Sequence, residues 1–190
     1  MSAAEDGPPS WLPQGFRASG VVAGLKDSGR PDLALVVNDG PLSAAAGVFT
    51  ANRVKAAPVL WSQQVLQAGQ VDAVVLNSGG ANACTGPDGF GDTHRTAEAV
   101  ADALGTGAAR VAVCSTGLIG VRLPMDRLLP GVVQAAAALS AHGGAPAAAF
   151  CGPSLTTSAR SGRPLSLRPA VVPAARKPLG SQVTGPPRSP

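Results

Sequence analysis

Two apolar segments on either side of one amphipathic helix constrain the fold of this chain more than any other feature. Residues 71–77 and 111–116 are rich in β-branched side chains, and strands this apolar are usually covered on both faces. The helix between them has one apolar face, formed by Ala97, Val100, Ala101 and Leu104, and Gly105 is a natural place for it to end. A strand, a helix and a strand of these lengths predict a βαβ unit, so the two strands should be parallel neighbours in an α/β domain.

Weaker patterns predict further elements on both sides of this unit. They are strands over 33–38, 45–50 and 58–61, the beginning of a helix over 62–66, a short helix over 124–129 that Pro130 breaks, and an Ala-rich helix over 132–142. Residues 78–91 read as a Gly/Asn-rich loop, after which Asp92 or Thr93 would cap the helix.

Two glycine-rich loops follow the two apolar strands, at the edge where α/β proteins place their sites. The first, residues 77–86, is either a site or a tight structural turn braced by asparagine side chains. It has neither of the glycine patterns that bind phosphate, which disfavours a nucleotide-binding module. In the second, residues 115–120, the Thr116 hydroxyl precedes the Gly117 amide. Such a pair can form an oxyanion hole, and the alternative is a Thr-Gly turn that stabilises only itself.

The remaining reactive side chains form no recognisable constellation. His94 falls in the first turn of an expected helix, and His142 falls at an expected helix C-terminus, where a histidine mostly complements the helix dipole. The chain has three widely spaced cysteines, Cys84, Cys114 and Cys151. Their odd number and their spacing exclude a disulfide framework and a Cys-x-x-Cys zinc site. Cys84 lies in the first loop, so a reactive thiol is an alternative there. We expect no metal site and no bound cofactor.

The C-terminal residues differ sharply in composition from the rest. The net charge is +4, but the first 150 residues hold eleven acidic and nine basic residues, whereas residues 151–190 hold six basic residues, eight prolines and no acid. We predict a flexible start over 1–15, an α/β domain over 16–148, and a Pro/Arg/Ser-rich tail over 149–190 that is disordered or out of frame. The scattered tail charges and the absence of long apolar runs predict no nucleic-acid partner and no membrane, and we expect a cytoplasmic protein.

At these loops the sequence resembles the ornithine acetyltransferase family of arginine biosynthesis, the bifunctional glutamate N-acetyltransferase type. The resemblance covers roughly residues 14–132 and is carried by residues 32–36, 46–59, 77–86 and 115–120. Gly80 stands where the family usually has Asn. The resemblance implies a layered α/β fold and a precursor that cuts itself into an α chain and a β chain, assembled as α2β2.

The resemblance also implies an activity. The N-terminal threonine of the β chain takes acetyl from N-acetylornithine and passes it to glutamate, and bifunctional members also accept acetyl-CoA as a substrate. The family's oxyanion hole is a Thr-Gly pair, which corresponds to Thr116 and Gly117.

The match ends before the tail. The family continues with Met-Thr-Thr-Asp, and here residues 155–158 read Leu-Thr-Thr-Ser, so Thr156 is the candidate for a substrate contact. The Lys-Gly-x-Gly-Met segment that leads to the nucleophilic threonine is absent, and we hypothesise that the reading frame is lost near residues 146–152. The chain is then either the α-chain region of an acetyltransferase or an inactive fragment or pseudoenzyme, at most a binding partner for a β chain.

Overall fold

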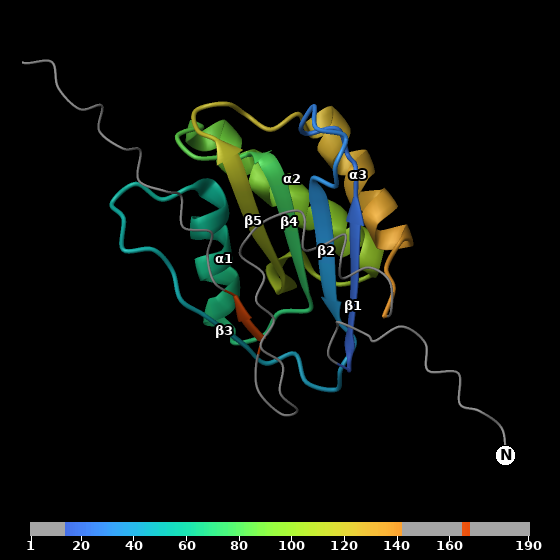
Figure 1. Cartoon of the computed structure of the whole chain (residues 1–190). Coiled ribbons are helices and arrows are strands. Elements are labelled where there is room, and N and C mark those ends of the chain that lie inside the picture. Colours follow the sequence, from blue (N-terminus) through green and yellow to red (C-terminus); the bar gives the residue numbers. More distant parts are fainter. Residues whose placement is uncertain (1–13, 142–164, 168–190) are drawn as a thin grey trace, which may run out of the picture.

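The computed structural model describes residues 14–141 and 165–167, and a four-stranded sheet forms the centre of this part of the chain (Figure 1). Its strands are β1 (Phe16–Val21), β2 (Leu33–Asn38), β4 (Ala73–Gly80) and β5 (Val111–Leu118), in the spatial order β1-β2-β4-β5. The β1–β2 and β2–β4 pairs are antiparallel, whereas β4 and β5 are parallel, which confirms the βαβ prediction within a mixed sheet. A second sheet pairs β3 (Ala45–Gly47) in parallel with β6 (Leu165–Leu167).

Helices cover one face of the larger sheet and one of its edges. They are α1 (Ala57–Gln67), α2 (Gly86–Leu104) and α3 (Met125–Ala137), and a 3-10 turn (Ala108–Arg110) leads into β5. Figure 1 shows α2 and α3 on the same side of the sheet and α1 beside β5. The hydroxyl of Ser19 in β1 donates to the carbonyl of Ala135 in α3 at 2.7 Å, which fixes α3 against the antiparallel half of the sheet.

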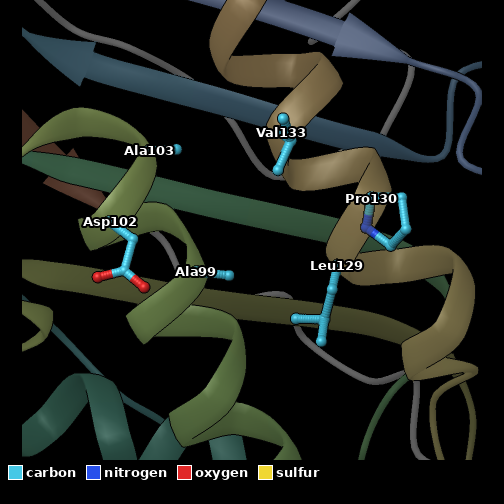
Figure 2. Close-up of a pocket in the computed structure, with 6 residues that line it drawn as sticks. All are labelled: Ala99, Asp102, Ala103, Leu129, Pro130 and Val133. Carbon is cyan, nitrogen blue, oxygen red and sulfur yellow. The ribbon is translucent and has the colours of Figure 1, made fainter.

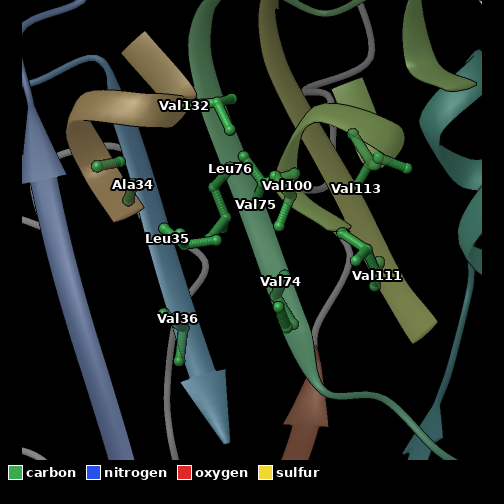
Figure 3. Close-up of a cluster of buried hydrophobic side chains, with 14 of the residues drawn as sticks. Ala34, Leu35, Val36, Val74, Val75, Leu76, Val100, Val111, Val113 and Val132 are labelled. Atoms are coloured by element: carbon green, nitrogen blue, oxygen red, sulfur yellow. The ribbon is translucent and has the colours of Figure 1, made fainter. Parts of the chain in front are cut away.

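The core lies between the sheet and the two helices that cover it. Its fully buried side chains include Leu35, Val75, Val100, Val111 and Val132 (Figure 3), together with Leu33 and Leu128, whereas Val74 is buried on the other face of the sheet. Burial of one such side chain contributes roughly 1.5–3 kcal/mol, so this cluster is the main source of stability. The predicted apolar face of α2 is confirmed, because Ala97, Val100 and Ala101 are buried and Gly105 ends the helix with a φ of 69°.

Helix α1 covers the outer edge of β5 with side chains. The indole N–H of Trp61 donates to the carbonyl of Val111 at 2.9 Å. The hydroxyl of Ser62 donates to the carbonyl of Val113 at 2.8 Å and accepts the N–H of the same residue at 3.0 Å. An uncovered edge strand offers its backbone groups to other chains, and α1 removes that possibility over this part of β5.

The prediction of a strand over 58–61 is therefore wrong, because these residues lie in the first two turns of α1. Pro58 suits the start of a helix, where the backbone N–H has no intrahelical partner. The neighbouring side chains of Trp61 and Ser62 both reach the backbone of β5, and that docking decides the conformation of a segment whose local pattern was ambiguous.

Helix α2 begins at Gly86, well before the predicted caps at Asp92 and Thr93. Pro87 lies in its first turn, and the carboxylate of Asp88 complements the positive end of the helix dipole there. The residues predicted as caps are instead buried inside the helix, where the Thr93 hydroxyl donates to the carbonyl of Gly89 at 3.1 Å. The loop predicted over 78–91 is correspondingly short.

The predicted break at Pro130 is also wrong, because α3 runs through it from Met125 to Ala137. A proline inside a helix costs about 3 kcal/mol through its missing N–H and its steric clash. Leu128, Val132 and Ala135 are all fully buried, and their packing offsets that cost.

The remaining predicted elements have different outcomes, and some of them lie outside the described residues. The strand predicted over 45–50 is confirmed for Ala45–Gly47 alone, since residues 48–50 leave the sheet and Val48 is exposed. The strand over 33–38 is confirmed as β2. Apart from residues 14–15 and β6, the expected flexible start and the tail over 149–190 lie outside the described residues.

Candidate functional site

The two glycine-rich segments lie side by side at the end of the parallel strands. The parallel register pairs Ser78 with Thr116 and Gly79 with Gly117, so both segments begin as strand rather than as loop. Past the strands, the N–H of Ala81 donates to the carbonyl of Leu118 at 2.8 Å, and a second such bond joins residues 120 and 83. The predicted proximity of the two segments is confirmed by this pairing.

Thr116 and Gly117 stand on the outer strand of the sheet, beyond the part that α1 covers. Thr116 is half-buried and Gly117 is exposed. Within the part of the chain that the structure describes, the Thr116 hydroxyl has no hydrogen-bond partner. A polar group that is partly buried and unengaged at a strand end is available to a ligand.

The direction of the Gly117 amide follows from the alternation of backbone groups along β5. Val113 turns its N–H and carbonyl outward to α1, whereas the carbonyl of Leu118 faces the β4 side. Because neighbouring residues alternate between the two sides, the N–H of Gly117 is predicted to point outward, on the same edge as Val113. There it would be free to donate to a negatively charged oxygen.

Only glycine fits at the point where the two strands meet. Gly79 has a φ of 116° and Gly117 a φ of 133°, a backbone conformation that other residues rarely adopt. A Cβ on Gly117 would lie 2.4 Å from the carbonyl carbon of Gly79, and a Cβ on Gly79 would lie 2.5 Å from the carbonyl oxygen of Leu25. Three backbone segments are therefore packed so closely that there is no room for a side chain on Gly79 or Gly117.

Asn82 gives the first glycine-rich segment the character of a braced turn. Its side chain is fully buried and its φ is 47°. Its amide nitrogen donates to the carbonyl of Gly89 at 2.7 Å and to the Thr93 hydroxyl at 2.8 Å, while its amide oxygen accepts from the Thr85 hydroxyl at 2.7 Å. The part of this segment around Asn82 is thus structural, and it joins β4 to the start of α2.

A second asparagine links the two strands directly. The hydroxyl of Ser115 donates to the amide oxygen of Asn77 at 2.5 Å, and the amide nitrogen of Asn77 donates to the carbonyl of Gly80 at 3.0 Å. This pair lies on the strand residues just before the candidate donors. It holds the end of β5 in register with β4.

The segment after Gly117 is tied to α2 by an ion pair that the sequence did not reveal. Asp92 is 1% exposed, and its carboxylate accepts from Nε and Nη2 of Arg122 at 2.9 and 2.8 Å. This carboxylate raises the pKa of Arg122. The sequence pattern predicts a helix cap at Asp92, whereas in the structure Asp92 lies inside α2 and binds Arg122, thirty residues further along the chain.

The other candidate side chains lie away from this arrangement or outside it. Burial raises the pKa of the Cys114 thiol to about 11, so the reactive thiolate is disfavoured. Cys84 is exposed, with a φ of 57°. His94 packs edge-on against Trp61 at 4.9 Å between ring centres, and its Nδ1 lies 3.3 Å from Glu98. The substrate candidate Thr156, together with His142 and Cys151, lies outside the described residues.

A surface groove lies between α2 and α3, with a volume of about 550 Å³ (Figure 2). It is lined by Ala99, Asp102, Ala103, Leu129, Pro130 and Val133. Asp102 is the one charged residue in this lining, and neither glycine-rich segment contributes to it. Across residues 14–141 and 165–167, no three His, Cys, Asp or Glu side chains are grouped as metal ligands, and no helix is long and apolar enough to span a membrane.

Comparison with known proteins finds relatives for most of the chain. The ArgJ family model matches residues 17–161, which extends beyond the resemblance carried by the motifs. The arginine biosynthesis bifunctional protein ArgJ of Streptomyces coelicolor is 74% identical over 135 residues, 71% of this chain and 35% of the relative. The protein of that name from Mycobacterium tuberculosis H37Rv is 68% identical over 137 residues, 70% of this chain and 33% of the relative. This chain spans about a third of the length of these curated relatives.

Two solved structures share the fold. The crystal structure of ornithine acetyltransferase complexed with ornithine from Mycobacterium tuberculosis is similar with a TM-score of 0.72 and 64% identity, over 73% of this chain and 75% of that chain. The arginine biosynthesis bifunctional protein argJ from Bacillus halodurans is similar with a TM-score of 0.60 and 41% identity, over 64% of this chain and 63% of that chain. The layered α/β prediction is confirmed by these matches.

Proposed function

Because the chain belongs to the ArgJ family, we propose that it forms the oxyanion-stabilising part of an acetyltransferase of arginine biosynthesis. The reaction we propose is the transfer of acetyl from N-acetylornithine to glutamate, with acetyl-CoA as a further donor. The observation that carries the proposal is the unengaged Thr116 hydroxyl near the end of β5. It lies next to Gly117, whose N–H we expect to point outward because backbone groups alternate along the strand.

The proposed chemistry needs hydrogen-bond donors at this position. Attack on the acetyl carbonyl produces a tetrahedral intermediate with negative charge on its oxygen. A hydroxyl and a backbone amide held in advance by the sheet stabilise that charge more than they stabilise the neutral carbonyl, and each donor can contribute roughly 3 kcal/mol. The fixed backbone around Gly117 supports this role, because donors that need no rearrangement lose no stabilisation to reorganisation.

We propose that the nucleophilic threonine belongs to a second chain, corresponding to the part of the relatives that follows the matched segment. The matched segment makes up 75% of the solved Mycobacterium tuberculosis chain but 33% of the curated relative from the same organism. The solved chain is thus less than half as long as that relative, which supports a precursor divided into two chains. An α2β2 assembly is part of this proposal, and so is the expectation that the 190-residue chain alone does not turn over.

A reconstitution assay tests the proposal. The chain is produced alone and together with the part of the Streptomyces coelicolor relative that follows its matched segment, and acetyl transfer from N-acetylornithine to glutamate is measured. We expect turnover only from the combination. In that combination Thr116→Ala should lower kcat about 10²–10³-fold, whereas Thr106→Ala at the far end of the sheet should not affect it.

Each outcome is informative about a different part of the proposal. An unchanged rate in Thr116→Ala refutes the oxyanion role. Turnover by the chain alone refutes the division of labour between two chains. If calorimetry detects no N-acetylornithine binding and reconstitution yields no activity, the chain is an inactive fragment.

A further inference from the structure

Asp32 is a fully buried carboxylate that the proposed chemistry does not use. It lies immediately before β2 and is 0% exposed. Its oxygens accept the backbone N–H groups of Ala23 at 2.7 Å, Leu25 at 2.6 Å and Lys26 at 3.1 Å. Among the described residues, no Lys or Arg side chain forms an ion pair with it. Burial of a carboxylate is costly, so these three bonds must satisfy it.

The same residue is also bonded to β4 through its main chain. The carbonyl of Asp32 accepts the N–H of Ser78 at 2.8 Å, and the Ser78 hydroxyl lies 3.4 Å from the same oxygen. Asp32 therefore holds two segments at once. Its carboxylate shapes the turn over residues 22–31, and its carbonyl fixes the end of the strand that precedes Gly79.

The turn over residues 22–31 lies directly against Gly79, which is paired with Gly117 of the candidate site. The Leu25 carbonyl oxygen would lie 2.5 Å from a Cβ on Gly79, so it occupies the place of a side chain there. Gly79 in turn stands where a side chain of Gly117 would be, with its carbonyl carbon 2.4 Å from that position. A continuous row of close approaches leads from the carboxylate, through the backbone of Leu25 and Gly79, to the Cα of Gly117.

We propose that Asp32 is a positioning residue for the Thr116–Gly117 donor pair. By fixing the turn over residues 22–31, its carboxylate prevents Gly79, and hence Gly117, from moving away from the place where the oxyanion forms. This inference rests on the oxyanion role proposed above. The alternative is that Asp32 stabilises the turn and has no influence on the position of the donors.

The test uses Asp32→Asn in the reconstituted enzyme and in the 190-residue chain. Asp27→Asn is the matched control, because Asp27 is exposed on the same turn and loses the same charge. A displacement of catalytic groups by about 1 Å can reduce the rate ~100-fold. We expect Asp32→Asn to lower kcat roughly 10- to 100-fold with little change in KM, and Asp27→Asn to change neither.

Nuclear magnetic resonance of the chain gives a readout that does not depend on activity. In Asp32→Asn the backbone amide resonances of Gly79 and Gly117 should shift, whereas that of Val113, held by α1, should not. Shifts confined to the turn over residues 22–31, with Gly117 unchanged, overturn the proposal. If Thr116→Ala slows transfer and Asp32→Asn does not, the proposal also fails. If neither slows transfer, the oxyanion role itself fails, and the resonances still decide whether Asp32 positions Gly117.

A second variant keeps the test valid if Asp32→Asn does not fold. Arg127 is exposed on α3, and its Nη1 donates to the carbonyl of Gly24 in the same turn at 2.9 Å. Arg127→Met removes this bond without disturbing a buried group. We expect smaller shifts at the same two glycine amides, and their absence would contradict the proposed row of contacts.

Discussion

The two ends of the β4–β5 pair are held together by different contacts. Where the strands begin, the carboxylate of Asp72 accepts two hydrogen bonds from the Arg110 guanidinium and one from the Thr106 hydroxyl, all at 2.6 Å. Where the strands end, Gly79 and Gly117 touch backbone to backbone. A charged cluster closes the first end, whereas the second combines the side-chain bond between Asn77 and Ser115 with backbone packing that leaves no room for a side chain on Gly117.

The largest effect is expected from adding a methyl group to Gly117, where β5 lies against Gly79 of β4. Gly117→Ala combines a φ of 133° with a contact 2.4 Å from Gly79, and strain together with overpacking should destabilise the chain by about 3 kcal/mol or more. Gly120→Ala is the matched control, because its φ is 81° but nothing lies within 4 Å of its Cβ, and it should lose only about 1–2 kcal/mol. Urea unfolding measures both. Equal losses would mean that the close approach of the strands contributes nothing.

A smaller effect is expected from neutralising the charged end. Asp72→Asn keeps the shape of the side chain but weakens its bonds to Arg110 and Thr106, so we expect a loss of about 1–2 kcal/mol in urea unfolding. Asp102→Asn, at an exposed position on α2, should change stability by less than about 0.5 kcal/mol. The Gly117 amide resonance should not respond to Asp72→Asn. A response would show that the two ends are coupled rather than independent.

The smallest effect is a pH dependence confined to the charged end. Hydrogen bonds from Arg110 lower the pKa of Asp72 from 3.8 to about 2 in the folded chain. A lowered folded-state pKa gives a stabilisation that is present above pH 3.8 and is lost as the pH falls towards 2. With allowance for solvent screening of this partly exposed pair, the loss should be about 1 kcal/mol. Asp72→Asn should lose this part of the pH dependence, and an unchanged acid profile would argue against the ion pair.

The sequence predicts the central part of the fold because its signals there are redundant. Residues 71–77 and 111–116 are apolar enough to favour burial on both faces, and a helix between them favours parallel neighbouring strands. The strand prediction over residues 58–61 is wrong because a short apolar run suits a strand or a buried helix turn equally well. The bonds from Trp61 and Ser62 to β5 decide between them, and those partners lie about fifty residues further along the chain.

The proximity of the two glycine-rich segments was predictable, but the contacts that hold them were not. The order Thr116-Gly117 after an apolar strand suited either a pair of donors or a simple turn, and only the family resemblance favoured the donors. The parallel register places this pair beside the first glycine-rich segment. The contacts that hold the pair are not encoded locally. Arg122 and Asp92 are thirty residues apart, and the link from Asp32 to Gly79 passes through main-chain atoms that any residue possesses.

The packing of Leu25, Gly79 and Gly117 has a consequence for mutational surveys of this chain. Alanine scanning works by deletion, so it identifies residues whose side chains contribute and is silent where there is no side chain to delete. At Gly79 and Gly117 an alanine inserts an atom into occupied space, and the measured loss reports an intrusion rather than a missing contact. A map of this region would therefore have to be drawn from additions of graded size, starting with the smallest.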